Sequence, residues 1–397
     1  MTQTFCGDLP IRNTPLYYAH QYIDETDIAA VVEVLRSDYL TCGPKIAKLE
    51  HRLCELTNAG YSVAVSNGTA ALHAACYAAG IRPGDEVITT PITFAASANC
   101  IRYCGGIPVF ADIDPHTYNI SPKAIEQVIT DKTKAVIAVD FTGQAVELDA
   151  IRAICDAYKL VLIEDAAHSL GTKYKGRAVG GIADLTTFSF HPVKTVTGGE
   201  GGAVLTNRFD FAQRLMLFRS HGITRDETLF QNTSHGSWYY EQLDLGMNYR
   251  MTDFQAALIL SQLEKLDMFS QRRKEIVAQY NQAFSEIPEL ILQQEIPESD
   301  TTRHLYLLRL NSKLLSMTRQ EFIKAMADRK IICNVHYIPV YWHPYYQSLG
   351  YQKGICPEAE RIYEEIVTIP LYFGMRDEDI AYVIQSVKDI LRTFGNQ

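Results

Sequence analysis

Seven short apolar runs between Tyr61 and Asn207 constrain the fold of this chain more than any other feature of its sequence. The runs are continuous rather than alternating in polarity, rich in Val, Ile and Phe, and bounded by Gly, Pro or Asp. Strands that are buried on both faces of a mainly parallel sheet have this pattern. Because amphipathic segments separate several of the runs, we predict an α/β domain of three layers around a seven-stranded sheet. The predicted strands are Ser62–Val65, Glu86–Thr90, Ile107–Ile113, Ala135–Phe141, Leu160–Glu164, Leu185–Phe190 and Gly202–Leu205.

The pattern changes near Leu263. From there to Ile287 the apolar spacing predicts one long amphipathic helix, which Pro288 ends. We therefore expect a large domain over residues 1–262, with an N-terminal arm, and a smaller C-terminal α/β domain over residues 263–397. The other predicted elements are helices Ala70–Ala79, Pro122–Ile129, Leu148–Tyr158, Arg319–Asp328 and Asp377–Thr393, strands Leu305–Leu310 and Ile331–Tyr337, and a long loop over Thr224–Leu243.

Composition excludes several classes of protein. The formal net charge is −9 and no run is rich in Lys or Arg, so we expect no nucleic-acid partner. No stretch approaches the roughly 20 apolar residues that cross a membrane, and Met1 to Pro10 lack the pattern of a signal peptide. We expect a cytoplasmic protein without a membrane partner. Its nine cysteines are scattered and odd in number, which favours free thiols over disulfides or a metal site.

Two segments of the large domain suggest a site for a phosphorylated, planar ligand. Ser66–Ala70 follows a predicted strand and opens an Ala-rich helix, whose N-terminal N–H groups can bind a phosphate. Gly68 would let the backbone approach the phosphate, and Thr69 adds a hydroxyl. Phe94 follows another strand and could stack on a planar ring. Taken singly, an N-cap turn and a core aromatic are the commoner interpretations of these residues.

Two further segments supply reactive groups. Asp165 stands at the carboxyl end of an apolar strand, where open α/β sheets bind ligands, and could pair with a protonated ring nitrogen; it could equally cap the next helix. Lys194 follows the strand ending near Phe190, in a glycine-rich segment that is unusual for a solvated lysine. A partly desolvated lysine can form a Schiff base. Ser189 could reach the same phosphate as Thr69.

Together these segments contain what a pyridoxal phosphate site requires: a Schiff-base lysine, a carboxylate for the ring nitrogen, a phosphate cradle and a stacking face. Their residues and order resemble the DegT/StrS family of fold-type I sugar aminotransferases, in the motifs Ser66–Thr69, Glu164–His168, Ser189–Lys194 and Gly199–Gly202. The resemblance implies that Lys194 and Asp165 are catalytic. It also implies cofactor contacts by Gly68, Thr69, Phe94, Asp165, His168, Ser189, Lys194 and Asn248.

The resemblance further implies a homodimer. Gly246–Met251 is similar to a segment that enters the partner subunit's site, where Asn248 would contact the cofactor phosphate and Arg250 the substrate. Glu33–Thr41, Phe218–Gly222 and Val335–Tyr341 are similar to members that act on a UDP-linked 4-keto-6-deoxy-N-acetylhexosamine in pseudaminic acid biosynthesis; the last segment could equally be core packing. The implied substrate contacts are Tyr18, Asp38, Tyr39, Leu40, Thr41, Arg250, His336, Ile338, Pro339, Val340 and Tyr341.

We therefore expect transfer of an amino group from glutamate to C4 of such a sugar, giving UDP-4-amino-4,6-dideoxy-N-acetyl-β-L-altrosamine. Another 3- or 4-aminotransferase of nucleotide sugars is the nearest alternative. A sugar dehydratase of the same fold would carry His in place of Lys194. A non-catalytic, cofactor-binding regulator is the alternative from another class, and it would usually carry an added DNA-binding domain.

Overall fold

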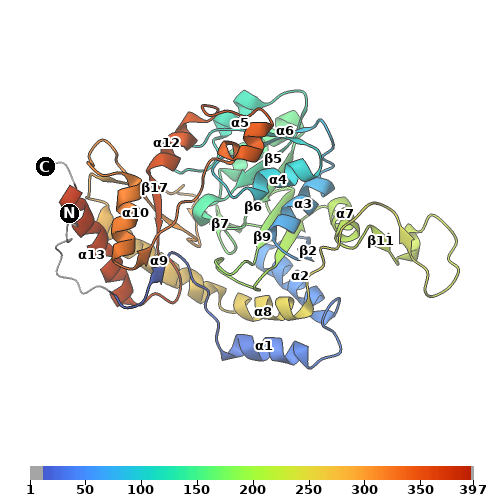
Figure 1. Cartoon of the computed structure of the whole chain (residues 1–397). Coiled ribbons are helices and arrows are strands. Elements are labelled where there is room, and N and C mark those ends of the chain that lie inside the picture. The colour runs from blue at the N-terminus through green and yellow to red at the C-terminus, as the bar shows by residue number, and fades with distance from the viewer. Residues whose placement is uncertain (1–11, 395–397) are drawn as a thin grey trace.

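The computed structural model describes residues 12–394. Its large unit is built on a seven-stranded sheet of order β2-β10-β9-β6-β5-β3-β4 (Figure 1). All neighbouring strands are parallel except β10, which runs antiparallel to both β2 and β9. The predicted mainly parallel sheet is confirmed. Its strands are β2 (Tyr61–Val65), β3 (Glu86–Thr89), β4 (Ile107–Phe110), β5 (Thr133–Val139), β6 (Val161–Asp165), β9 (Leu185–Ser189) and β10 (Gly202–Thr206).

Helices cover both faces of this sheet, because successive strand residues point to opposite sides. On β5, Ala135 and Ile137 join the apolar cluster beneath α3, α4 and α7, whereas Val136 and Ala138 join the cluster beneath α2, α6 and α8. This is the three-layer arrangement that the sequence predicts. The helices of the large unit are α1 (Glu25–Leu35), α2 (Pro44–Thr57), α3 (Gly68–Ala78), α4 (Ala96–Tyr103), α5 (Pro122–Val128), α6 (Leu148–Tyr158), α7 (Phe209–Arg219) and α8 (Asp253–Leu263).

The single helix predicted over Leu263–Ile287 is wrong in its extent. α8 ends at Leu263, and a separate helix, α9 (Leu266–Phe284), begins after Lys265. The Lys265 ammonium lies 2.6 Å from Asp24 Oδ1 and 2.9 Å from Asp27 Oδ2. These ion pairs fix the turn between the helices against the start of α1.

A smaller unit follows, with its own core of apolar side chains from α9, α10, α13 and a three-stranded antiparallel sheet. Only the first two residues of the strand predicted over Ile331–Tyr337 are strand, and they pair with Leu16–Tyr17 near the start of the chain. The domain boundary remains a prediction. The elements of this unit are β1 (Leu16–Tyr17), β13 (Leu290–Leu292), β15 (Tyr306–Leu310), α10 (Arg319–Asp328), β16 (Ile331–Ile332), α11 (Pro344–Ser348), α12 (Pro357–Glu365), β17 (Ile366–Ile369) and α13 (Asp377–Phe394).

The predicted loop over Thr224–Leu243 is an arm that projects from the body of the molecule beyond α7 (Figure 1). The short strands β11 (Ile223–Thr224) and β12 (Glu241–Gln242) pair at its base. A second small sheet joins β7 (Lys173–Tyr174) and β8 (Arg177–Ala178) to β14 (Ser299–Asp300). Within residues 12–394, no helix is both long and apolar enough to span a membrane.

Candidate active site

A cavity of about 800 Å³ opens at the carboxyl ends of the parallel strands, between the sheet and the smaller unit. Residues that follow β2, β3, β6 and β9 line its floor, and residues 334–337 of the smaller unit line its other side. Open α/β sheets bind ligands at this edge. The residues singled out in the sequence that line the cavity are Tyr18, Gly68, Thr69, Phe94, Asp165, His168, Ser189, Lys194 and His336.

One end of the cavity is formed by the N-terminus of α3. Asn67 caps this helix, since its Oδ1 accepts a hydrogen bond of 2.8 Å from the N–H of Ala70. A Cβ added to Gly68 would lie 2.8 Å from Ser189 Cβ and 3.0 Å from Ser189 Oγ. The helix terminus and the Ser189 hydroxyl therefore meet over a cradle that only glycine leaves open, which suits a phosphate group.

Asp165 lies at the end of β6, and only 4% of its surface is exposed to solvent. Its Oδ2 accepts a hydrogen bond of 2.7 Å from Ser97 Oγ, and its Oδ1 accepts one of 3.2 Å from the N–H of Ala167. Burial raises the pKa of this carboxyl, while these hydrogen bonds and Lys194 oppose the rise. A buried carboxylate of this kind binds a cationic partner strongly, and the protonated nitrogen of a pyridine ring is such a partner.

Lys194 lies in the turn after β9 and faces the same cavity. Burial of the side chain lowers the pKa of its ammonium to about 8. The negative charge of Asp165 acts in the opposite direction and raises this pKa. A lysine with a lowered pKa is present in part as the free amine near neutral pH, which is the form that attacks a carbonyl carbon.

Three histidines and a tyrosine gather on the side of the cavity nearer the smaller unit. His168 Nε2 lies 3.4 Å from Tyr337 Oη, and the rings of His168 and His304 have centroids 4.3 Å apart. His336 Nδ1 lies 2.7 Å from Thr368 Oγ1. Burial lowers the pKa of all three imidazoles, that of His336 to about 4, so the rings are neutral at neutral pH.

These groups fit pyridoxal phosphate: a desolvated lysine, a buried carboxylate, a phosphate cradle, and an aromatic ring, Phe94, that is 63% exposed at the cavity instead of lying in the core. Within residues 12–394, no cluster of His, Cys, Asp or Glu could hold a metal ion.

Other residues singled out in the sequence do not line this cavity. Val340 and Tyr341 are fully buried in an apolar cluster, where the Tyr341 hydroxyl donates a hydrogen bond of 2.5 Å to Glu360. Asn248 is exposed beyond α7, next to the base of the arm. The full set outside the cavity is Asp38, Tyr39, Leu40, Thr41, Asn248, Arg250, Ile338, Pro339, Val340 and Tyr341.

The sequence did not single out several residues that line the cavity, among them Ser97, Tyr103 and His304. Ser97 lies on α4, one helical turn after Thr93, whose hydroxyl is 2.7 Å from Ser97 Oγ. A serine after a strand has no distinctive pattern, so only the contact with Asp165 reveals its role.

Comparison with known proteins identifies the family. The sequence pattern of the DegT/DnrJ/EryC1/StrS aminotransferase family matches residues 21–388. The chain belongs to this family. Members of the family use pyridoxal phosphate, and this chain is a transaminase that acts on sugars.

Individual members of the DegT/DnrJ/EryC1/StrS family are similar over nearly their whole length. Spore coat polysaccharide biosynthesis protein SpsC of Bacillus subtilis is 42% identical, over 96% of this chain and 98% of SpsC. Helicobacter pylori PseC, an aminotransferase involved in the biosynthesis of pseudoaminic acid, is 31% identical with a TM-score of 0.89, covering 96% of this chain and 100% of PseC. The PLP form of the sugar aminotransferase Spr1654 from Streptococcus pneumoniae is 31% identical with a TM-score of 0.88, covering 96% of this chain and 99% of the other.

Proposed function

We propose that this sugar aminotransferase moves an amino group from glutamate to C4 of a UDP-linked 4-keto-6-deoxy-N-acetylhexosamine. The observation that carries the proposal is the likeness to PseC over the whole chain, together with the segments Glu33–Thr41 and Val335–Tyr341. The cavity supports it, because about 800 Å³ can hold a cofactor and a sugar together. We place the reaction in the cytoplasm on the sequence features alone.

The residues of the cavity have separate tasks in this proposal. Bound pyridoxal phosphate supplies an electron sink that stabilises negative charge at the carbon next to the reacting nitrogen. Lys194, as the free amine, would take the proton from Cα of glutamate and then give it back, acting first as base and then as acid. Asp165 remains ionised, because its partner is the positively charged ring nitrogen. Gly68, Thr69 and Ser189 hold the phosphate.

The sugar occupies the side of the cavity that is lined by Tyr18, His336 and Tyr337. Tyr18 and His336 have ring centroids 5.1 Å apart. Flat aromatic and imidazole surfaces with polar tips suit a sugar and its nucleotide. Val340 and Tyr341 act there as buried supports for the residues that precede them.

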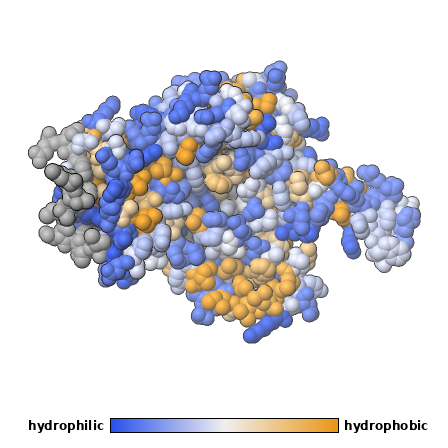
Figure 2. Space-filling model, viewed as in Figure 1, coloured by the Kyte–Doolittle hydropathy of each residue, from blue (hydrophilic) through white to orange (hydrophobic). Residues whose placement is uncertain are grey.

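We further propose a homodimer with shared sites. Figure 2 shows an apolar patch over α1 and α8, which agrees with the exposed side chains of Ile28, Leu35 and Phe254. The arm between β11 and β12 projects freely from the single chain (Figure 1). Asn248 and Arg250 lie next to the arm and outside their own chain's cavity, as expected of residues that serve the partner's cavity.

A second candidate is a different nucleotide sugar, or amination at C3. It is favoured by SpsC, which is more similar in sequence than PseC and whose name refers to spore coat polysaccharide. Mass spectrometry of products from a panel of nucleotide keto sugars, with glutamate as donor and Lys194→Ala as the blank, distinguishes the two. Amination of the UDP-linked 4-keto sugar alone supports the proposal. Turnover of only another sugar supports the second candidate, and absence of turnover with every sugar of the panel contradicts both candidates.

A further inference from the structure

We propose that His304 is a positioning residue of the active site, which holds the ring of His168 in one orientation toward the cofactor. The proposal rests on the proposed function, in which His168 is one of the cofactor contacts that the family resemblance implies and is taken to contact the hydroxyl of the cofactor ring. His304 comes from the segment that leads into β15, about 140 residues after His168 along the chain. Both side chains line the cavity, and both residues are buried.

The two rings form a close pair. Their centroids are 4.3 Å apart and their planes are inclined by 46°. Within residues 12–394, neither Nδ1 atom has a hydrogen-bond partner, and both atoms are buried from solvent. Neither Nδ1 atom therefore takes part in a hydrogen bond that holds its ring in place. The two rings contact each other by packing alone. The long contact of 3.4 Å between His168 Nε2 and Tyr337 Oη is the only hydrogen bond to this ring among residues 12–394, so the packing of His304 adds a second constraint on its orientation.

A glycine makes this pair possible. Gly143 has a φ of +98°, and a Cβ added there would lie 2.9 Å from the His304 nitrogen and 3.0 Å from the His168 carbonyl oxygen. The backbones that carry the two histidines thus approach each other across Gly143. Any side chain at this position would separate them.

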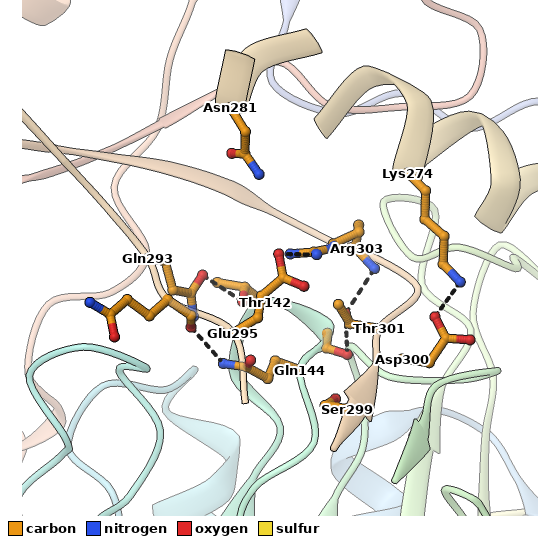
Figure 3. A network of polar contacts seen from close by, with 12 residues as sticks. Thr142, Gln144, Lys274, Asn281, Gln293, Glu295, Ser299, Asp300, Thr301 and Arg303 are labelled. Atoms are coloured by element: carbon orange, nitrogen blue, oxygen red, sulfur yellow. Dashed lines mark hydrogen bonds and ion pairs between the residues drawn. The ribbon is translucent and has the colours of Figure 1, made fainter. Parts of the chain in front are cut away.

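A polar network holds the His304 segment in place (Figure 3). Thr301 Oγ1 donates a hydrogen bond of 2.7 Å to the Gly143 carbonyl, and the N–H of Ile296 donates one of 2.6 Å to Gln144 Oε1. Ion pairs join Arg303 to Glu295 and Lys274 to Asp300. The segment from residue 293 to residue 303 is therefore tied to the loop after β5, immediately before His304.

A buried arginine fixes the backbone of His304 from the other side. Arg273, on α9, is 3% exposed, and its Nη1 donates to the carbonyls of His304 at 3.3 Å and Leu371 at 3.0 Å. The N–H of His304 donates to the Thr142 carbonyl at 2.8 Å. Both backbone groups of His304 are thus bonded, which fixes the position from which its ring projects toward His168.

The surroundings of His168 explain why its orientation matters. The titratable groups around it are Lys194, His304, His336 and Tyr337, with Asp165 three residues earlier. A second proton on the His168 ring is disfavoured first by burial, to which the neighbouring His304 ring contributes, and then by the charge of Lys194. While the ring pair is intact, His168 stays neutral and can offer one fixed N–H to the oxygen of the cofactor ring.

The test follows the protonation of His168 by ¹⁵N NMR of histidine-labelled protein, with the resonance assigned by its loss in His168→Gln. We expect no titration of His168 between about pH 5.5 and pH 8 in the wild type, whereas His304→Ala gains a step near the ordinary imidazole range of about 6.5. His304→Phe, which keeps an aromatic ring, is expected to restore the neutral state. Binding of pyridoxal phosphate, followed by its own fluorescence, should weaken about fivefold in His304→Ala, the loss of roughly one oriented hydrogen bond.

His73→Asn is the matched control, because His73 is similarly buried, at 6%, and does not line the cavity. It should leave the His168 resonance unchanged. A His168 that remains neutral in His304→Ala, with unchanged cofactor binding, overturns the proposal, and so does a His304→Phe protein that titrates like His304→Ala. His304→Asn replaces the alanine variant if that variant does not fold. The proposed function is tested separately: if pyridoxal phosphate binds to the protein without attachment to Lys194, the proposed function is wrong.

Discussion

Ser97 Oγ donates a hydrogen bond of 2.7 Å to Asp165 Oδ2, and this bond joins α4 to the end of β6 at the point where the ring nitrogen of the cofactor would lie. The N–H of Ala167 bonds the other carboxylate oxygen. Asp165 is thus oriented on both sides before any ligand binds. Such preorganisation lets the carboxylate hold a ring cation without rearrangement.

Asp165→Asn should keep the fold and lose at least tenfold in rate. The substitution is nearly isosteric, but the ring nitrogen loses its ionic partner. A hydrogen bond to a charged group is worth about 1.5–3 kcal/mol, and each ~1.4 kcal/mol is tenfold in rate. Single-turnover conversion with saturating glutamate measures this step apart from sugar binding. Ser97→Ala, which removes only the supporting bond, should lose less. A wild-type rate in Asp165→Asn would assign Asp165 a structural role only.

Gly68→Ala should weaken cofactor binding about tenfold, because the added methyl group would have to displace Ser189 from the phosphate cradle. Equilibrium dialysis of pyridoxal phosphate measures the effect, and circular dichroism checks the fold. Gly374→Ala is the control, since a Cβ there would meet no atom closer than 3.8 Å. Equal affinity in the two variants would rule out the cradle as the phosphate site.

The cofactor-free protein should lose stability as the pH rises above about 4 toward neutral. Asp140 and Glu164 are fully buried next to each other beneath the cavity, and burial raises the pKa of both carboxyls. The folded chain then holds protons that the unfolded chain has released, so the free energy of unfolding falls by up to about 1.4 kcal/mol per pH unit for each retained proton.

Urea unfolding at a series of pH values should therefore show a flatter dependence in the double variant Asp140→Asn/Glu164→Gln. Asp149 provides a control of opposite sign, because Lys175 lowers its pKa through an exposed ion pair. Asp149→Asn should remove a contribution that is present above the ordinary carboxyl range and lost as the pH falls. An unchanged pH dependence in the double variant would mean that both buried carboxyls are ionised.

Mixing two inactive proteins tests the shared site. Lys194→Ala and Arg250→Ala chains should each be inactive, and their heterodimer should contain one intact site in two. Random mixing then restores about a quarter of the wild-type activity. The assay is product formation after subunit exchange, which native mass spectrometry verifies. Exchange without recovery would show that each chain completes its own site.

The strands of the sheet could be predicted from the sequence because each is a buried apolar run with a polar boundary. α6 and α10 have the predicted bounds, Leu148–Tyr158 and Arg319–Asp328. α8 was not predicted, and the predicted helix start at Leu263 lies at the break between α8 and α9. The break depends on ion pairs from Lys265 to residues about 240 positions earlier in the chain.

The order of the motifs along the chain was enough to predict the candidate site around Lys194 and Asp165, because each motif follows a strand and strand ends meet at one edge. His304 had no such signal. It follows a polar run and precedes a buried strand, and its place beside His168 depends on Gly143. Contacts of this range depend on the packing of two units, which a local pattern does not encode.

The pairing of Leu16–Tyr17 with Ile331–Ile332 has a consequence for how the chain folds as it is made. The large sheet uses residues from β2 to β10 and can assemble while the later part of the chain is still on the ribosome. The smaller unit cannot, because Leu16, part of its core, has to wait for a strand made more than 300 residues later. This closing pair has one of the longest sequence separations in the molecule, and it makes completion of the smaller unit a late event in synthesis.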